Sequence, residues 1–467
     1  MAVAGLTILD LTKVNVALPS IENALGAESA QLQLIVAGYV LTFGLFLVPM
    51  GRLGDQRSRR LLFVIGLAVF TLASLAAALA TDATMLLIAR LVQGAAAGTQ
   101  MPQVLGTIQV LFRGRARGRA FGLFGAVVGV SVALGPTLAG LLIAVGGAHD
   151  GWRWIFWMNV PLGLAAIGLV LWLLPETRER SRRRVDLDPV GVVLFAASVF
   201  ALLWPFLFTT GAPDDNPARW WLLLACAVLV ALFVLWERWY AAHGRQPLLP
   251  GLLMRIGSFR NGTVIQAAYF AATPAMLLLT TLYLQIGLDV PPVFAGMVSI
   301  GFALTNAVGS WVAGTLVGRF GRTIVVWGLV VVLLTLVGLT VVVMVSARDL
   351  VPYAMAAVLT VSGIGGGLVI SPNQTLTLAQ VPVAQGGLAG SVGQLGQRIG
   401  TAIGSAIALA LFYATIYREN DGRPKPDVFH DAFLFGMISV IVFGLIAFAV
   451  ALADLGQRRR SAQPPTP

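Results

Sequence analysis

The charged side chains that lie within long apolar runs of this sequence are the candidates for binding and releasing a proton. Asp10 and Lys13 share the first apolar run, and Arg90 lies in the fourth. A lone carboxylate in apolar surroundings is costly to ionise, so its charge depends on whether water, a cation or another ligand reaches it. We therefore predict that Asp10 carries a proton and that Arg90 and Lys13 govern its charge.

The same three charges also permit a purely structural interpretation. Lys13 is three residues from Asp10 and so on the same face of a helix, where it would form a permanent ion pair. Arg90 would serve equally well as that partner, or would clamp the carbonyl groups of a neighbouring helix. The sequence leaves these alternatives open.

The elements that position these residues must cross a membrane. Of the 467 residues, 58% are hydrophobic and only 11% are charged. Runs such as 61–80 and 323–346 are long enough, as helices, to cross about 30 Å of hydrocarbon. In order, the apolar runs predict fourteen spans at 2–19, 32–50, 61–81, 84–106, 119–143, 153–174, 189–210, 219–237, 258–286, 293–317, 323–346, 350–373, 389–417 and 431–454.

The basic residues indicate how these spans are oriented. The odd-numbered connections contain few Lys or Arg residues, whereas the even-numbered ones carry clusters such as those at 57–60 and 113–119. By the positive-inside rule, we expect both termini in the cytoplasm. The net charge of +11 then reflects orientation in a lipid bilayer and not a nucleic-acid surface, because the arginines lie in short loops between apolar runs.

An imperfect repeat indicates that the chain is duplicated. Residues 51–59 and 314–322 are two copies of one pattern, and each copy lies between two apolar runs. We predict an all-α membrane protein of two six-helix bundles, a twofold arrangement typical of secondary transporters. The bundles are expected at 1–175 and 258–454, with a linker of two extra transmembrane helices at 176–257 and a cytoplasmic tail at 455–467.

Taken together, these motifs resemble the fourteen-helix drug/proton antiporters of the major facilitator superfamily over nearly the whole chain. The matching segments are 9–19 in the first span, 51–60 in the first repeat, 87–94 around Arg90, the fifth-span glycines from Gly125 to Gly140, 152–156 with 159–161, and 282–285. Lys13 departs from the family pattern, in which an apolar residue is usual. The resemblance implies a monomeric, proton-coupled multidrug exporter in the bacterial cytoplasmic membrane, of the kind that confers antibiotic resistance.

The loop after the second span is interpreted as a conformational latch of Gly51, Asp55 and Arg59. Asp55 is placed to accept hydrogen bonds from the N-terminus of a neighbouring helix and to pair with Arg59, which would stabilise the state closed to the cytoplasm. Ser58 replaces the family's glycine and the connection at 106–118 has no acidic residue, so we expect a weaker latch than usual. The second copy of the repeat has Gly318 in place of Asp55, so only the first half should carry the latch.

Glycines in the fifth span are expected to let helices pack closely. This antiporter motif consists of Gly125, Gly129, Gly135, Pro136 and Gly140. Glycine permits close helix contact and proline interrupts the hydrogen bonds of the helix, so we interpret the motif as a packing seam on which the bundles rock.

Polar and aromatic residues within apolar spans are the candidates for a substrate cavity. They are Asn15, Tyr39, Gln93, Gln266, Tyr269, Asn306, Gln394 and Arg398. Each would equally be satisfied between helices, and Arg398 would alternatively extend towards the cytoplasm. Because Lys13, Arg90 and Arg398 outnumber Asp10, we expect the cavity to favour neutral, zwitterionic or anionic amphiphiles over dications.

Other classes of protein are disfavoured. His149, His243 and His430 all fall in or beside loops, so no intramembrane acid–base pair of an enzyme is apparent. No Gly-Lys phosphate loop, filter sequence or cysteine pair is present, and we predict neither a cofactor nor a metal. The alternative function is export of one physiological lipid, secondary metabolite or amino acid by the same fold.

Overall fold

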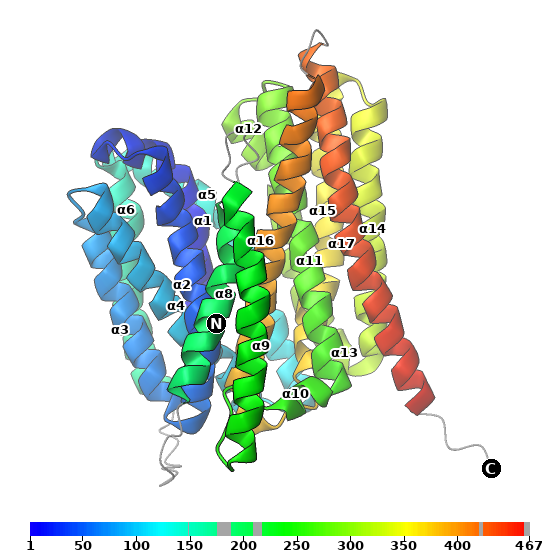
Figure 1. Cartoon of the computed structure of the whole chain (residues 1–467). Helices are drawn as coiled ribbons and strands as arrows, with labels where there is room; N and C mark the ends of the chain where they lie inside the picture. Colours follow the sequence, from blue (N-terminus) through cyan, green and yellow to red (C-terminus); the bar gives the residue numbers. More distant parts are fainter. Residues whose placement is uncertain (148, 175–187, 209–216, 420–423, 462–467) are drawn as a thin grey trace.

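The computed structural model describes residues 1–147, 149–174, 188–208, 217–419 and 424–461, and every regular element within them is a helix. Thirteen helical segments in this part of the chain are long and apolar enough to cross a membrane. They stand roughly side by side in two groups with a helical hairpin between them (Figure 1). The prediction of a many-spanning, all-helical membrane protein is confirmed.

The N-terminal bundle contains the first seven helices. These are α1 (Ala2–Leu25), α2 (Ser29–Gln56), α3 (Arg59–Ala78), α4 (Ala83–Leu111), α5 (Gly114–Gly146), α6 (Gly151–Trp157) and α7 (Asn159–Leu173). Helices α6 and α7 together form one apolar segment. Local signals start α3 and α4, because the side chains of Ser58 and Asp82 accept hydrogen bonds from the free backbone N–H groups of Leu61 and Met85.

A helical hairpin follows the first bundle. It consists of α8 (Pro189–Leu207), the short turn η1 (Pro217–Trp220) and α9 (Trp221–Ala242), and α10 (Gly251–Arg255) leads out of it. Asp188 caps α8, and Pro189 occupies the first turn, where a missing N–H is harmless. Of the linker predicted at 176–257, residues 176–187 and 209–216 lie outside the described part of the chain.

The C-terminal bundle contains the remaining elements. These are α11 (Gly257–Leu282), η2 (Tyr283–Gly287), α12 (Pro292–Met297), α13 (Ile300–Phe320), α14 (Arg322–Val345), η3 (Arg348–Leu350), α15 (Val351–Thr377), η4 (Val383–Gln385), α16 (Gly386–Glu419) and α17 (Lys425–Ser461). Helix α17 continues beyond residue 454, where the last span was predicted to end, because its backbone hydrogen bonds persist past the apolar segment.

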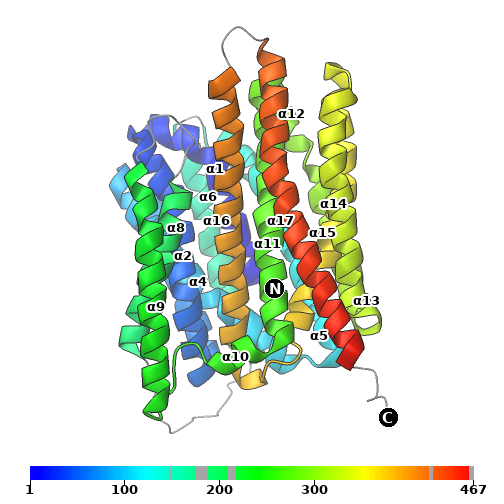
Figure 2. The same ribbon diagram turned by 45° about the vertical axis from the view of Figure 1, so that its right-hand side comes forward.

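Two pairs of helices join the bundles in a pseudo-symmetric way. Helix α2 packs on α16, and α13, its counterpart in the repeat, packs on α5. Figure 2 shows α16 between the hairpin and α11. The first glycine of each repeat copy lies at these contacts, since a side chain on Gly51 would meet Gly387 and Ser391, and one on Gly314 would meet Gly118 and Gly122.

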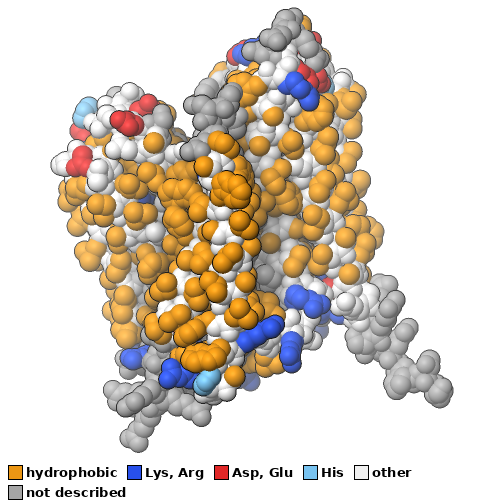
Figure 3. Space-filling model, in the orientation of Figure 1, with side chains coloured by type: hydrophobic (Ala, Val, Ile, Leu, Met, Phe, Trp, Pro, Cys, Tyr) orange, Lys and Arg blue, Asp and Glu red, His pale blue; other side chains and the backbone are white. Residues whose placement is uncertain are grey.

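Charge is distributed unevenly over the surface. On the face shown in Figure 3 a broad apolar belt covers the helices, and Lys and Arg side chains gather at its lower edge. We call this edge, where α2 ends and α3 begins, the arginine-rich end. Helix α17 also ends there (Figure 1).

Candidate functional site

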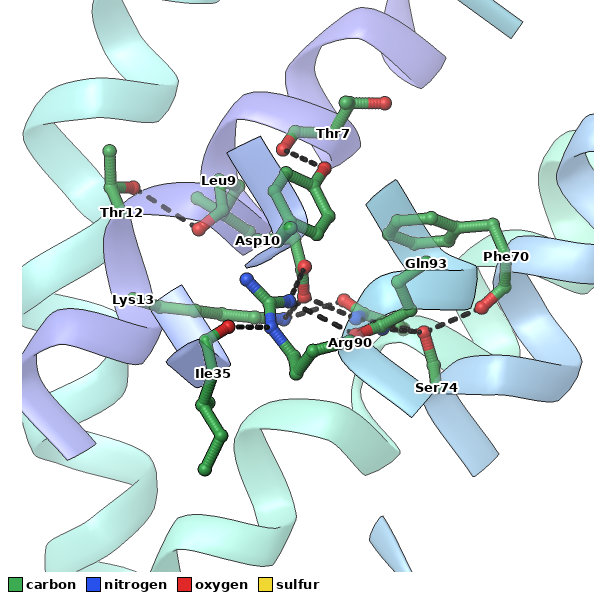
Figure 4. Close-up of polar contacts among 12 residues, drawn as sticks. Thr7, Leu9, Asp10, Thr12, Lys13, Ile35, Phe70, Ser74, Arg90 and Gln93 are labelled. Carbon is green, nitrogen blue, oxygen red and sulfur yellow. Dashed lines mark hydrogen bonds and ion pairs between the residues drawn. The ribbon is translucent and has the colours of Figure 1, made fainter. Parts of the chain in front are cut away.

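Asp10 lies at the centre of a fully buried polar network. The side chains of Asp10, Lys13 and Arg90 have no solvent exposure. An Arg90 Nη1 atom is 2.6 Å from Asp10 Oδ2, and Lys13 Nζ is 3.3 Å from Asp10 Oδ1. Both cations that the sequence offered as partners therefore contact the carboxylate, one on each oxygen (Figure 4).

Asn159 on α7 joins this network, and sequence reasoning assigned it no role. Its Nδ2 donates to Asp10 Oδ1 at 2.7 Å, and its Oδ1 accepts a hydrogen bond from Lys13 Nζ at 2.5 Å. The same Nδ2 lies 3.2 Å from the hydroxyl of Ser74 on α3. Asn159 was visible only as part of the segment 159–161, and neither charge nor periodicity marks it out.

Arg90 is held by more than its ion pair. It donates to Gln93 Oε1 at 3.0 Å and to the carbonyl of Ile35 at 3.4 Å, and its guanidinium carbon lies 4.2 Å from the centre of the Tyr39 ring. Gln93 in turn donates to Ser74 at 2.6 Å. Tyr39 and Gln93, expected in a substrate cavity, are fully buried in this network of the N-terminal bundle.

Close helix packing brings these groups together. A side chain at Gly94 would collide with the backbone of Tyr39, so glycine at this position lets α4 approach α2. The approach places Arg90, one turn before Gly94, against both Tyr39 and α1. In a low-dielectric interior, the electrostatic free energy of one carboxylate beside two cations changes strongly when any of them gains or loses a proton.

The latch residues connect the two bundles at the arginine-rich end. The backbone N–H groups of Gly387 and Leu388, at the start of α16, donate to the two Asp55 oxygens at 3.0 and 2.8 Å. Arg59 Nη2 is 2.6 Å from Asp55 Oδ1 and also donates to the carbonyl of Val383. Asp55 thus occupies the N-terminus of a helix in the opposite bundle, where backbone donors and the helix dipole favour an anion.

Gln109 adds a second polar contact between the bundles, and sequence reasoning missed it. Its Nε2 donates to the carbonyls of Leu378 at 3.0 Å and Val381 at 3.3 Å, beyond the end of α15. The residues around a glutamine in an apolar segment do not indicate that its partner lies 269 residues away.

The second repeat copy has a different arrangement. Gly318 supplies no carboxylate, and Arg322, the counterpart of Arg59, pairs with Asp454 on α17 at 2.5 Å. Arg322 also donates to Asn373, and Asn261 donates to Asp454 at 3.0 Å. This cluster connects four helices of the C-terminal bundle, namely α11, α14, α15 and α17.

The fifth-span glycines make two different contacts, and one of them makes none. Gly125 and Gly129 face α13 of the opposite bundle, at Ser310 and Ala307. Gly135 faces Thr12 on α1, and a side chain on Gly140 would meet nothing within 4 Å. Pro136 lies inside α5, which continues through it.

The other cavity candidates lie mainly in the C-terminal bundle. Gln266 donates to Gln374 at 2.9 Å, while Tyr269 and Asn306 are buried near Gly366. Gln394 is buried on α16, and the Arg398 guanidinium carbon lies 4.6 Å from the centre of the Phe43 ring on α2. Asn15 is exposed.

The arrangement of possible metal ligands and the surroundings of Cys226 are visible in the described residues. Within them, no group of three His, Cys, Asp or Glu side chains is arranged to hold a metal ion. Cys226 is buried, and its sulfur lies 3.4 Å from the carbonyl of Ser198.

Comparison with known proteins identifies relatives for most of the chain. Residues 1–248 match the model of the Major Facilitator Superfamily. The chain is 32% identical to the probable actinorhodin transporter of Streptomyces coelicolor, over 88% of this chain and 70% of that protein. It is 31% identical to the multidrug resistance protein Stp of Mycobacterium tuberculosis, over 84% and 71%, and 34% identical to a puromycin resistance protein of Streptomyces alboniger, over 86% and 78%.

Solved structures share the fold at much lower identity. The proton:xylose symporter XylE superposes with a TM-score of 0.66 at 15% identity, covering 97% of this chain and 94% of that one. The human organic anion transporter MFSD10 superposes with a TM-score of 0.64 at 13% identity, covering 96% and 98%. The family match, the related sequences and the shared fold agree: this chain belongs to the major facilitator superfamily and is a multi-pass membrane transporter, not an enzyme.

Proposed function

We propose that this protein is a proton-coupled antiporter that exports hydrophobic or amphiphilic small molecules by alternating access. Its relatives in Streptomyces and Mycobacterium are named for actinorhodin transport, multidrug resistance and puromycin resistance. Because these relatives are bacterial, we place the protein in the bacterial cytoplasmic membrane. The observation that carries the proton coupling is the sealed contact of Asp10 with Arg90 and Lys13.

The proposal includes fourteen spans, with α4 as the span that is not among the thirteen apolar segments. Helix α4 packs along both α2 and α3. Its buried residues include Arg90, Gln93, Gln100, Gln103 and Gln109, so its polar side chains are turned into the bundle and away from lipid. Low average hydropathy is therefore compatible with a span that other helices surround.

The arginine-rich end is assigned to the cytoplasm, and the structure then corresponds to the state closed on that side. The bonds from Gly387 and Leu388 to Asp55, and from Gln109 to the end of α15, all cross between the bundles at this end. Opening to the cytoplasm must break them. The latch would thus stabilise one of the two states that alternating access requires.

Coupling follows from the charges around Asp10. Protonation of Asp10 would remove the only carboxylate that contacts Lys13 and Arg90 within the described residues. Two buried cations without an anion are unstable, by several kcal/mol in comparable cases. Protonation would therefore favour a rearrangement of α1 against α4 and α7, which ties the charge state of Asp10 to the conformation.

Transport in proteoliposomes tests this proposal. With an imposed proton gradient, Asp10→Asn should lose uphill export and retain counterflow exchange, because the variant keeps the shape and loses the titrating group. Glu22→Gln, an exposed carboxyl change on the same helix, is the matched control and should retain both activities. Gradient-driven uphill export by Asp10→Asn would show that Asp10 is not the coupling group.

A second candidate is an exporter dedicated to one physiological compound. The name of the Streptomyces coelicolor relative specifies a single compound, whereas that of the Mycobacterium relative specifies many drugs. Competition between chemically unrelated compounds in the same proteoliposomes separates the two. Mutual inhibition by several unrelated compounds supports the multidrug function, and inhibition by one class alone supports the dedicated one.

A further inference from the structure

Helix α16 carries three polar side chains for which the described residues supply no hydrogen-bond or ion-pair partner. Gln394, Gln397 and Arg398, here called the α16 polar stripe, are spaced three and four residues apart and so lie on one side of the helix. Within the described part of the chain, none of the three forms a hydrogen bond or an ion pair. Arg398 Nε is buried without a partner, while the side chain as a whole stays partly exposed.

The stripe lies between the two bundles at the depth of the membrane core. Gly387, Gly390 and Ser391 contact the N-terminal bundle, and Gln394 and Arg398 follow on the same helix face after one and two turns. Arg398 is twelve residues from the start of α16, which corresponds to about 18 Å along the helix. The Phe43 ring, 4.6 Å from its guanidinium carbon, confirms that Arg398 faces the opposite bundle.

Unlike Arg90 and Lys13, Arg398 has no anionic partner among the described residues. Arg90 and Lys13 are both held by Asp10 and are fully enclosed. No carboxylate of the described residues lies within 4 Å of Arg398, and its polar neighbours along α16 are the two glutamine amides. A charge removed from bulk water requires a partner or remaining hydration, and the planar guanidinium group matches an oxyanion in a bidentate geometry.

We propose that the α16 polar stripe binds the acidic group of amphiphilic substrates, of the class of aromatic or aliphatic carboxylates. Arg398 supplies the charge, and the amide groups of Gln394 and Gln397 supply further hydrogen-bond donors. The Phe43 ring flanks the guanidinium and offers an apolar surface to the body of the substrate. This inference rests on the proposed export function and names its substrate class.

The stripe is connected to the Asp10 network by contiguous packing. The rings of Phe43 and Tyr39 are 6.1 Å apart, and Tyr39 stacks against Arg90, which pairs with Asp10. A bound carboxylate would place a second negative charge at the other end of this short series of contacts. The substrate site and the coupling site are therefore adjacent and separate.

A pair of probes tests the proposal: a fluorescent aromatic carboxylic acid and its methyl ester, which has the same aromatic body, one more methyl group and no charge. Both are measured for binding to the purified full-length protein in detergent and for gradient-driven export in proteoliposomes. For Arg398→Gln the ratio of acid to ester should fall about tenfold or more in both assays, as expected when a charged hydrogen-bond partner is lost. Arg398→Lys keeps the charge but lacks the paired N–H donors of the guanidinium group, so it should give an intermediate ratio.

Controls separate this inference from the proposed function. Arg255→Gln, an exposed arginine change, should leave the ratio unchanged. An equal loss of acid and ester in Arg398→Gln, or an unchanged ratio, overturns the assignment. Competition of phosphatidylglycerol with the acid in detergent would assign the stripe to a lipid headgroup and also overturn it. Absence of gradient-driven export in the wild type would refute the proposed function, whereas the binding ratio in detergent still decides the stripe.

Discussion

The carboxamide of Asn159 connects Asp10 to Lys13, accepting from the ammonium group at 2.5 Å and donating to the carboxylate at 2.7 Å. Lys13 is the residue that departs from the usual family pattern, and Asn159 gives its charge a second partner besides Asp10. Asn159 is the first residue of α7. Through the hydrogen bonds of its carboxamide and their partners, the network joins α7 to α1, α3 and α4. A change at Asp10 therefore affects most of the N-terminal bundle.

Replacing Asn159 should destabilise this bundle and weaken coupling. Asn159→Ala removes two hydrogen bonds to charged groups, each of which contributes about 1.5–3 kcal/mol to the free energy of unfolding. We expect a lower thermal unfolding midpoint, measured by tryptophan fluorescence in detergent, and reduced gradient-driven export. Asn15→Ala, an exposed asparagine change on α1, should shift the midpoint little. Equal midpoints for the two variants would contradict a structural role of Asn159 in the network.

Breaking the latch should open the contact between the two bundles at the arginine-rich end. Asp55→Asn removes the charge that two backbone N–H groups and Arg59 share. A cysteine introduced at the buried position Ser391, in a Cys226→Ser background, reports opening through its rate of alkylation by an impermeant maleimide in inverted vesicles. We expect a rise of about tenfold or more, since charged hydrogen bonds of this kind contribute about 1.5–3 kcal/mol.

Arg57→Gln is the matched control for the latch experiment, because Arg57 is exposed in the same loop. Its labelling rate should equal that of the parent. A labelling rate that does not change in Asp55→Asn would show that the contact with α16 does not control opening.

Two glycines of α5 should respond in opposite directions to the same substitution. A methyl group on Gly118 would lie 2.5 Å from the Gly314 carbonyl oxygen in the other bundle, whereas Gly140 has open space around it. Gly118→Ala should therefore lower the unfolding midpoint. Gly140→Ala should raise the free energy of unfolding by about 0.5–1 kcal/mol, because alanine reduces the entropy lost on forming a helix. If both substitutions stabilise the protein, the α5–α13 contact is not the close seam described above.

The Arg322 cluster should be a major source of stability for the C-terminal bundle. Asp454→Asn leaves Arg322 buried beside Asn373 and Arg458 without its anion, at a cost of about 3–5 kcal/mol. Thermal unfolding in detergent measures this loss. Asp427→Asn breaks an exposed pair with Arg348 and should cost about 0–1 kcal/mol. A comparable loss in the two variants would argue against a buried clamp.

Hydropathy predicted the helices well because the free energy of transferring a segment to hydrocarbon is a sum of contributions from the residues of that segment. The helix boundaries differ in a consistent way: the span predicted at 431–454 is part of α17, which runs from Lys425 to Ser461. Backbone hydrogen bonds and caps continue a helix beyond the hydrocarbon, and hydropathy does not record them. Helix α4 shows the opposite case, since its polar residues lower its hydropathy although neighbouring helices enclose it.

The candidate site was predictable only in part. Asp10, Lys13 and Arg90 are conspicuous because charges in apolar runs are costly, and the spacing of Asp10 and Lys13 places them on one helix face. Asn159, Ser74 and Gln109 carry no charge, and their partners lie 19 to 272 residues away in sequence. Of the three cations counted for the cavity, Arg90 and Lys13 are enclosed with Asp10, whereas Arg398 faces the opposite bundle and has no carboxylate partner among the described residues.

The amino-acid order by itself determined that this is a many-spanning helical membrane protein with charges inside its apolar segments. These properties follow from local terms, namely residue transfer energies, helix periodicity and the distribution of arginines along the chain. Tertiary structure alone decided which of those charges meet, that Asp55 reaches the start of α16, and that Arg398 faces the opposite bundle. Ion pairs and hydrogen bonds act over about 3 Å, and only the packing of helices distant in sequence sets distances that short.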